Sequence, residues 1–166
     1  MSLISIIFPY YKKKKFLRDS VNSILNQTYQ NFEILLIDDE VSEDSLGFLE
    51  EINKCDPRIH LIKNEYNMGA GESRNRAIKF SKGQYIAFCD CDDLWKNNKL
   101  ELQLGFMKKF NLNFSHTSYE IIDENKKILG HREVDDEVNF NKLINSCDIG
   151  LSTVMVNKVV FNDAEF

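Results

Sequence analysis

The sequence is poor in the residues that mark unusual classes of protein. Its 166 residues include only two prolines and seven glycines, which excludes collagen-like and low-complexity chains. It contains no stretch of about 18 apolar residues, so we expect no transmembrane segment. The first residues lack the basic and long apolar segments of a secretory signal. We therefore expect a soluble, cytoplasmic protein.

Cysteine and histidine are also scarce. The four cysteines form no Cys-x-x-Cys pair, and the three histidines lie far apart in the sequence. Neither pattern has the spacing of zinc ligands, and four scattered cysteines do not suggest a disulfide framework. We expect reduced thiols and no metal bound by histidine or cysteine.

Positive charge is in the minority. The chain has 21 Lys and Arg residues against 26 Asp and Glu residues, which gives a formal net charge of −5. Nucleic-acid-binding domains usually carry a basic patch and a high isoelectric point, so we exclude that class. A chain of this length buries roughly 70 % of its unfolded surface. We predict one globular domain over residues 1–166.

Apolar runs alternate with helical patterns through the first two thirds of the chain. Strands are predicted at residues 3–8, 32–37, 59–62 and 84–88. Helices are predicted around residues 17–25, 43–52, 71–80 and 100–107. This order predicts an α/β fold with a mostly parallel, doubly wound, Rossmann-like sheet and flanking helices.

Three residues mark expected ends of these elements. Pro9 is expected to close the first strand, and Ser42 to cap the second helix. Gly83 stands where a left-handed residue would end the third helix.

The pattern changes after Asn111. Strands are predicted at 114–122 and 127–129 around an Asp123-Glu124-Asn125 turn, with a short helix at 140–144 and a strand at 151–156. We therefore expect antiparallel additions to the sheet in the C-terminal part.

Carboxylates gather where two predicted strands end. Asp38-Asp39 follows the second strand, and Asp90-Cys91-Asp92-Asp93 follows the fourth. Ligands of parallel α/β sheets bind at this edge, and so many acids repel one another unless a cation or hydrogen-bond donors lie among them. Asp90 and Asp92, on an expected extended segment, would project to the same side. This suits Mg²⁺ or Mn²⁺ shared with a ligand phosphate, although helix capping or chance also explains such pairs.

A glycine-containing segment, Asn67 to Arg76, precedes the third helix. A helix N-terminus favours an anion, and Arg74 and Arg76 could meet a phosphate or a carboxylate. The alternative is a glycine-capped helix with solvated arginines. The segment matches neither a P-loop nor a dinucleotide-binding fingerprint.

Five segments, taken in order, resemble the motifs of a known family. They read SIIFPYY, SILNQTYQNFEILLIDDE, NMGAGESRNRAI, GQYIAFCDCDDLW and LSTVMVNKVVF. They look like the successive motifs of the inverting family-2 glycosyltransferases, whose nucleotide-binding fold is called GT-A. The resemblance runs from about Ser5 to Phe161.

The resemblance implies roles for residues on the two sides of a bound nucleotide. Pro9 and Tyr11 would hold the base, and Asp39 would accept a hydrogen bond from the uracil ring or its equivalent. On the other side, Arg74 would contact the nucleotide and Asp90 would lie near the ribose. Asp92 would bind the Mn²⁺ or Mg²⁺ that bridges the diphosphate.

The chain departs from the family pattern at two loops. Lys12 replaces the usual Asn and opens a run of four lysines, and we expect its side chain to be solvated rather than near the diphosphate. The usual Asp-Asp-Gly-Ser turn reads Asp39-Glu40-Val41-Ser42, which leaves the loop beside the base undefined.

The catalytic base of the family is an acid in a later motif. Only Asp163 and Glu165 follow the last matching segment, so we identify no base. We expect residues 1–110 to be the nucleotide-binding half and residues 111–166 the start of an acceptor half. Such a chain would bind donor and metal but transfer slowly, since losing a general base costs about 10² to 10⁴-fold.

The leading hypothesis is an enzyme that transfers a sugar from a nucleoside-diphosphate sugar, with UDP as the expected nucleotide. The sugar is transferred with inversion to a hydroxyl of a glycan or lipid-linked acceptor. This places it in the cytoplasm or at the inner face of the membrane, with peripheral membrane association left open. The alternative is a module that binds the nucleotide sugar without turnover. A flavodoxin-like signalling domain or a nucleotidyltransferase fits less well, because the expected phosphoacceptor aspartate and glycine-rich arginine loop are missing.

Overall fold

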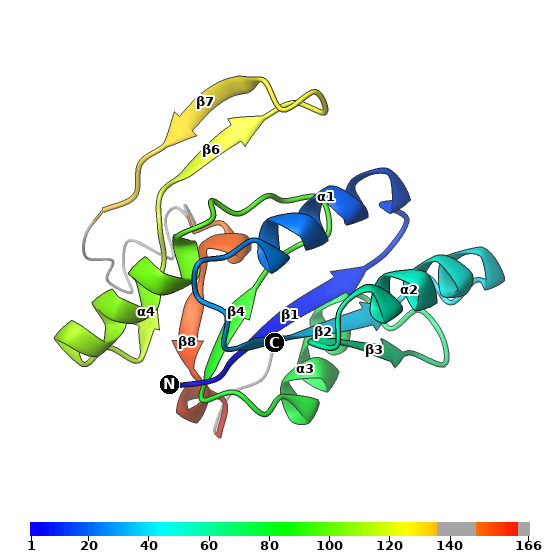
Figure 1. Cartoon of the computed structure of the whole chain (residues 1–166), viewed down its shortest axis with the longest axis horizontal. Helices are drawn as coiled ribbons and strands as arrows, with labels where there is room; N and C mark the ends of the chain where they lie inside the picture. The colour runs from blue at the N-terminus through cyan, green and yellow to red at the C-terminus, as the bar shows by residue number, and fades with distance from the viewer. Residues whose placement is uncertain (136–148, 163–166) are drawn as a thin grey trace.

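The computed structural model describes residues 1–135 and 149–162. Six strands form one sheet in the order β3-β2-β1-β4-β8-β5, and two more form a separate hairpin (Figure 1). The parallel strands are β1 (Ile4–Tyr10), β2 (Phe32–Asp38), β3 (Ile59–Lys63) and β4 (Tyr85–Phe88). β8 (Met155–Asn157) runs antiparallel between β4 and β5 (Phe114–Ser115). The prediction of a mostly parallel sheet with antiparallel additions is confirmed.

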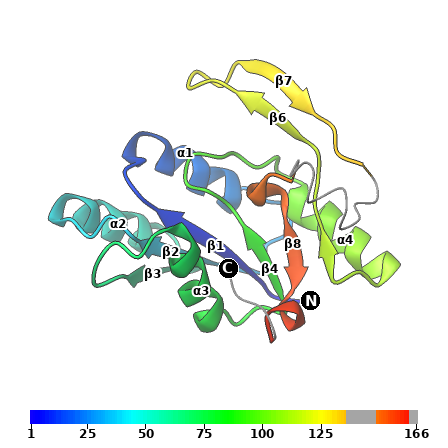
Figure 2. The same cartoon turned by 180° about the vertical axis from the view of Figure 1, so that it is seen from behind.

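Helices cover both faces of the sheet (Figures 1 and 2). They are α1 (Lys14–Leu25), α2 (Glu43–Cys55), α3 (Ala70–Phe80) and α4 (Lys99–Phe110). Buried side chains of α1, α2 and α4 form one hydrophobic core with one face of the strands, and those of α3 form a second core with the other face. Successive side chains of a strand point to opposite faces, so β1 contributes Ile6 to the first core and Ile7 to the second. This explains why the predicted strands read as unbroken apolar runs.

A hairpin of β6 (Tyr119–Ile122) and β7 (Ile128–Arg132) lies over α1 (Figure 1). Its tip is held by two ion pairs, Lys126 to Asp19 at 2.8 Å and Lys15 to Glu124 at 2.6 Å. The turn between the two strands falls at Asp123, where the sequence predicts it. The chain finally adds the short 3₁₀ helices η1 (Leu151–Thr153) and η2 (Lys158–Asn162).

Three strand predictions need correction. Pro9 does not close β1, which continues to Tyr10. β4 pairs with β1 only as far as Ile7, so the missing N–H of Pro9 leaves no gap in that ladder. The strand predicted at 114–122 divides into β5 and β6, which belong to different sheets, and the strand predicted at 151–156 begins as η1. The helix predicted at 140–144 lies outside the described residues.

Two helix predictions have different outcomes. Ser42 caps α2 as predicted, because its side chain accepts a hydrogen bond from the backbone N–H of Ser45. Gly83 does not end α3 in a left-handed conformation, since α3 ends at Phe80 and is followed by the extended residue Ser81. Gly83 instead lies against β1, where a Cβ atom would stand 2.5 Å from the backbone nitrogen of Ser5. The glycine is needed for close approach of two backbones.

Within the described residues, no helix combines the length and apolar character needed to cross a bilayer.

Replacing Gly83 by Ala should destabilise the fold. The added methyl meets backbone atoms of β1 that cannot move without disturbing the sheet, so we expect a loss of about 1–3 kcal/mol in the free energy of unfolding. Urea denaturation measures it. The matched control is Gly47→Ala in α2, where a Cβ has nothing within 4 Å and alanine should add up to about 1 kcal/mol. Equal effects of the two substitutions would contradict this account of Gly83.

Candidate functional site

A cavity of about 380 Å³ opens at the carboxyl ends of β1, β2 and β4. The sequence analysis places its candidate residues at these strand ends and before α3. The structure brings all six into the lining of the one cavity: Pro9, Tyr11, Asp39, Arg74, Asp90 and Asp92. Their convergence follows from the parallel pairing of the three strands, because parallel neighbours end at the same edge of a sheet.

Asp39 is held by the segment that precedes α3. Its Oδ1 accepts hydrogen bonds from the Asn64 side chain at 2.9 Å and the Met68 backbone at 2.8 Å, and its Oδ2 accepts one from the Gly69 backbone at 3.1 Å. The residue is only 3 % exposed, yet it lines the cavity. An ionised carboxylate has about four acceptor positions, so three donors leave room for a further N–H.

The loop from Asn67 to Gly69 is shaped by this aspartate. The side chain of Asn67 donates to the backbone oxygen of Asp39 at 2.8 Å, which closes the loop over the end of β2. Gly69 has a φ of 81°, a conformation that favours glycine, and it directly precedes α3. Arg76, offered as an anion ligand beside Arg74, instead donates to the side-chain oxygen of Asn64 at 2.7 Å. Arg76 therefore supports the loop from behind.

Asp38 shapes the loop that departs from the family pattern. Its Oδ1 accepts hydrogen bonds from the backbone N–H groups of Glu40 and Val41, both at 3.2 Å. Val41 adopts a φ of 58°, so it takes the left-handed conformation that the usual glycine would supply. Such a conformation is rare for a β-branched residue and is retained because Asp38 fixes the turn.

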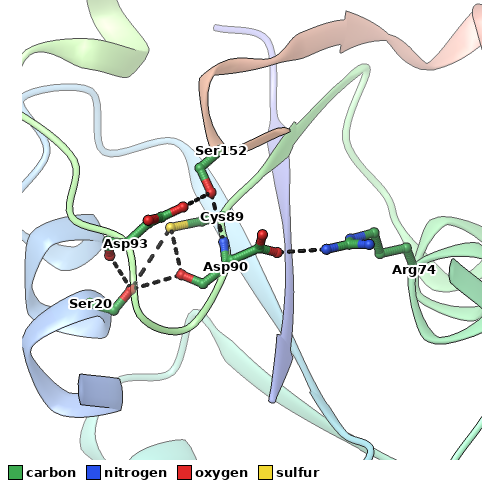
Figure 3. Close-up of polar contacts among 6 residues, drawn as sticks. All are labelled: Ser20, Arg74, Cys89, Asp90, Asp93 and Ser152. Atoms are coloured by element: carbon green, nitrogen blue, oxygen red, sulfur yellow. Dashed lines mark hydrogen bonds and ion pairs between the residues drawn. The ribbon is translucent and has the colours of Figure 1, made fainter. Parts of the chain in front are cut away.

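The acids after β4 lie in a turn rather than on an extended segment. The backbone N–H of Asp93 donates to the oxygen of Asp90 at 3.0 Å, so Asp90 and Asp92 do not follow the alternation of a strand. The prediction that they project to one side for that reason is wrong, although both face the cavity. Asp90 receives a hydrogen bond of 2.6 Å from the guanidinium of Arg74 on α3 (Figure 3).

Two serines from distant segments hold this turn (Figure 3). Ser20 on α1 donates to the backbone oxygen of Asp93 at 2.6 Å. Ser152 on η1 accepts from the backbone N–H of Asp90 at 3.0 Å and donates to the carboxylate of Asp93. Burial raises the pKa of Asp93, which is turned toward Ser152 and is absent from the cavity lining.

Asp92 stands at the mouth of the cavity and pairs with a lysine. The Nζ of Lys13 lies 2.9 Å from the Oδ2 of Asp92, and this hydrogen bond raises the pKa of Lys13. Over residues 1–135 and 149–162, no three His, Cys, Asp or Glu side chains are arranged to hold a metal ion. Asp92 supplies one accessible carboxylate, and a metal here would need further oxygen ligands from a bound molecule.

The cavity lining also includes two side chains that are uncharged at neutral pH, those of Tyr10 and Cys91. Burial raises the pKa of the Cys91 thiol to about 11, and burial together with Glu40 raises the pKa of the Tyr10 hydroxyl. Both groups line the cavity and stay protonated at neutral pH. Cys55, Cys89 and Cys91 are free thiols, and Cys147 lies outside the described residues.

Lys13, Ser20 and Ser152 are functional residues that the sequence patterns do not predict. The lysine run is a visible signal, but only its first residue, Lys12, stands at a position of the family motif. Nothing in the sequence distinguishes Ser20 or Ser152 from other serines, because their role depends on β4, α1 and η1 meeting in space. Asp163 and Glu165, the acids considered as a base, lie outside the described residues.

Comparison with known proteins gives a consistent family. The model described as Glycosyl transferase family 2 matches residues 5–159. A UDP-Glc:alpha-D-GlcNAc-diphosphoundecaprenol beta-1,3-glucosyltransferase of Escherichia coli, WfgD, is 40 % identical over 164 residues, which cover 99 % of this chain and 64 % of WfgD. The putative teichuronic acid biosynthesis glycosyltransferase TuaG of Bacillus subtilis is 33 % identical over 94 % of this chain and 62 % of its own length. The chain thus spans a little under two thirds of these two relatives.

Solved structures share the fold. S. aureus TarS 1–349 superposes with a TM-score of 0.76 at 22 % identity, over 98 % of this chain and 49 % of that one. The same protein in complex with UDP-GlcNAc gives 0.71 at 20 % identity, over 98 % and 47 % of the two chains. The mannosyltransferase PcManGT from Pyrobaculum calidifontis, in complex with GDP-Man and Mn²⁺, gives 0.63 at 15 % identity, over 72 % and 35 %. At these identities the likeness establishes the GT-A-type fold.

Proposed function

Since this chain belongs to glycosyltransferase family 2, we propose that it binds a UDP-sugar, with a divalent metal, in the cavity at the carboxyl edge of the sheet. The sugar is transferred with inversion to a hydroxyl of an acceptor. One observation carries the proposal: the six residues selected from the motifs line one cavity, although they come from four separated segments of the chain.

The uracil ring is proposed to lie against Pro9 and Tyr11, with its N–H directed to Asp39. Tyr11 is half exposed and lines the cavity, so part of its ring is accessible to a base. The unused acceptor position of Asp39 suits a ring N–H. A buried carboxylate that three donors already hold in place loses little freedom when it accepts a fourth hydrogen bond.

The diphosphate is proposed to lie beyond the base, between Arg74, Asp90 and Asp92. Asp92 would bind Mn²⁺ or Mg²⁺ through one carboxylate, and phosphate oxygens would complete the coordination, which is how such ions usually bind at phosphate sites. The metal would stabilise negative charge on the departing diphosphate. Arg74 keeps Asp90 in position beside the ribose through their 2.6 Å contact.

The acceptor is proposed to be lipid-linked. The name of WfgD gives a diphosphoundecaprenol-linked sugar as its acceptor, and the identity to this chain extends over nearly all of its residues. We place the reaction at the cytoplasmic surface of a membrane, with peripheral association of the protein. Inversion requires a carboxylate base on the acceptor side, and we assign no residue to it.

The first test is nucleotide binding. UDP with Mn²⁺ should stabilise the protein by about 2.7 kcal/mol at a hundredfold excess over the dissociation constant, and UDP alone should stabilise it much less. Thermal unfolding with a panel of nucleotides, with and without Mn²⁺, measures this. Asp92→Asn should remove the metal dependence and leave the unfolding temperature of the free protein nearly unchanged, because Asp92 is exposed. Indifference to every nucleotide would refute the proposal.

The second test concerns base recognition. Asp39→Asn should weaken UDP binding about tenfold or more, because an amide donor replaces part of the acceptor, while Mn²⁺-pyrophosphate, which has no base, should bind nearly as before. Calorimetry with both ligands gives the comparison. Asn67→Ala is the control, since it loosens the same loop without altering the carboxylate. Equal losses for the two ligands in Asp39→Asn would argue against a contact with the base.

A second candidate function is binding of the nucleotide sugar without turnover. It is compatible with the span of the chain, which covers 64 % of the length of WfgD. An assay of sugar transfer distinguishes the two candidates. It measures the rate at which this 166-residue chain transfers a labelled sugar from UDP-glucose to an acceptor. If the chain only binds the donor, its rate should lie at least a hundredfold below an ordinary enzymatic kcat of about 10 s⁻¹, because losing a general base costs about 10² to 10⁴-fold. Transfer at the ordinary rate would show that the chain contains its base.

A further inference from the structure

The four consecutive lysines before and at the start of α1 have four different surroundings. Lys13 pairs with Asp92, and Lys15 pairs with Glu124 on the hairpin. Lys12 lies over the ring of Tyr11 and Lys14 over the ring of Phe48, each with its Nζ 5.1 Å from the ring centre. Of the four, all of which the structure describes, only Lys13 lines the cavity. All four side chains are exposed, as expected for Lys12, and Lys13 differs from the others in lining the cavity.

The backbone directs Lys13 into the cavity at some cost. Lys12 has a φ of 53°, which is uncommon outside glycine, and its backbone N–H donates to Glu40 at 3.1 Å. This reversal of the chain sets Lys13 at the N-cap position of α1, where its side chain makes no capping hydrogen bond. A cation at a helix N-terminus opposes the helix dipole. Helix stability alone would favour Ser, Asp or Asn at this position.

Other acids of the cavity have partners that a ligand does not need to displace. Asp39 has three hydrogen-bond donors, and Asp90 is bound by the largely buried guanidinium of Arg74. Asp90 and Asp92 are equally exposed, at 38 % and 37 %, but the side chain of Lys13 is 47 % exposed whereas that of Arg74 is 14 % exposed. Exposed pairs of this kind are weak, so a stronger ligand can separate them.

We propose that Lys13 is a diphosphate-binding residue that releases Asp92 when the donor and its metal bind. This rests on the proposed function, because it assumes that the cavity takes a nucleoside diphosphate and that Asp92 binds the metal. The ammonium and the metal compete for one carboxylate. When the metal takes Asp92, the two charges that it adds are balanced by the two negative charges of the donor diphosphate. Lys13, which already lines the cavity, then pairs with a phosphate oxygen.

This exchange makes an unusual prediction for a residue that aids donor binding. Without nucleotide, Lys13 obstructs the metal, so Lys13→Met should tighten Mn²⁺ binding by about two- to fivefold, the strength of an exposed ion pair. With Mn²⁺ present, the same substitution removes a charged contact with the diphosphate and should weaken UDP binding about tenfold. Titration of free Mn²⁺ by electron paramagnetic resonance, and of UDP by calorimetry, measures the two effects separately.

Two further variants separate this exchange from a general loss of charge. Lys14→Met removes the same charge from the neighbouring residue, whose side chain lies over Phe48 and not in the cavity, and should leave both affinities nearly unchanged. Lys13→Arg keeps a cation at the position and should restore most of the UDP affinity. Methionine preserves the length of the lysine stem, and thermal unfolding of each variant confirms that it is folded.

The outcomes distinguish this inference from the proposed function. Opposite changes in Mn²⁺ and UDP affinity, confined to Lys13→Met, support the exchange. If Lys13→Met behaves like Lys14→Met, or weakens both ligands together, the exchange is wrong while donor binding by the parent protein stands. If the parent protein binds neither UDP nor Mn²⁺, the proposed function fails, and this inference fails with it.

Discussion

The carboxyl edge of the sheet gathers several carboxylates in a small space, and each of them must be neutralised or hydrogen-bonded for the fold to persist. Asp38 accepts hydrogen bonds from backbone N–H groups of its own loop, and Asp39 accepts them from backbone N–H groups of the segment before α3. Asp90 is paired with an arginine and Asp92 with a lysine. This division gives every loop around the cavity its shape. The loops are ordered by the acids that they surround, and so the cavity forms together with them.

The same requirement connects the site to the rest of the fold. The partners of these acids come from the residue before α1, from α3, and from the loops after β2 and β3, so the site is assembled from elements on both faces of the sheet. The strands themselves are buried on both faces by two separate cores, which keeps their ends in fixed register. The rigid part of the molecule is therefore the sheet, and the chemistry is placed on the loops at its edge.

The amino-acid sequence allowed most of the parallel sheet to be predicted from local patterns, and six of the residues that line the cavity from strand ends together with the family resemblance. Unbroken apolar runs indicate doubly buried strands, and acids directly after such runs mark the ligand edge. The prediction that Gly83 ends a helix is wrong. A left-handed helix end and a close approach of two backbones both require glycine, and only the position of the neighbouring strand β1 distinguishes them. Lys13 and Ser152 were missed because their partners are distant in the sequence. No local pattern in the sequence shows that Ser152 forms a hydrogen bond with the turn after β4.

The contact between Ser152 and the turn after β4 affects the order in which the protein folds. The backbone of Asp90 is bonded to Ser152, 62 residues later, and β8 enters the sheet between β4 and β5 from the same late segment. Contacts between residues so far apart require a long loop to close, which makes them slow to form. During synthesis at about 5–20 residues per second, the first three strands and their helices emerge several seconds before Ser152. The parallel strands can therefore pair early on the ribosome, whereas the turn from Asp90 to Asp93 acquires its final shape only when Ser152 and β8 arrive.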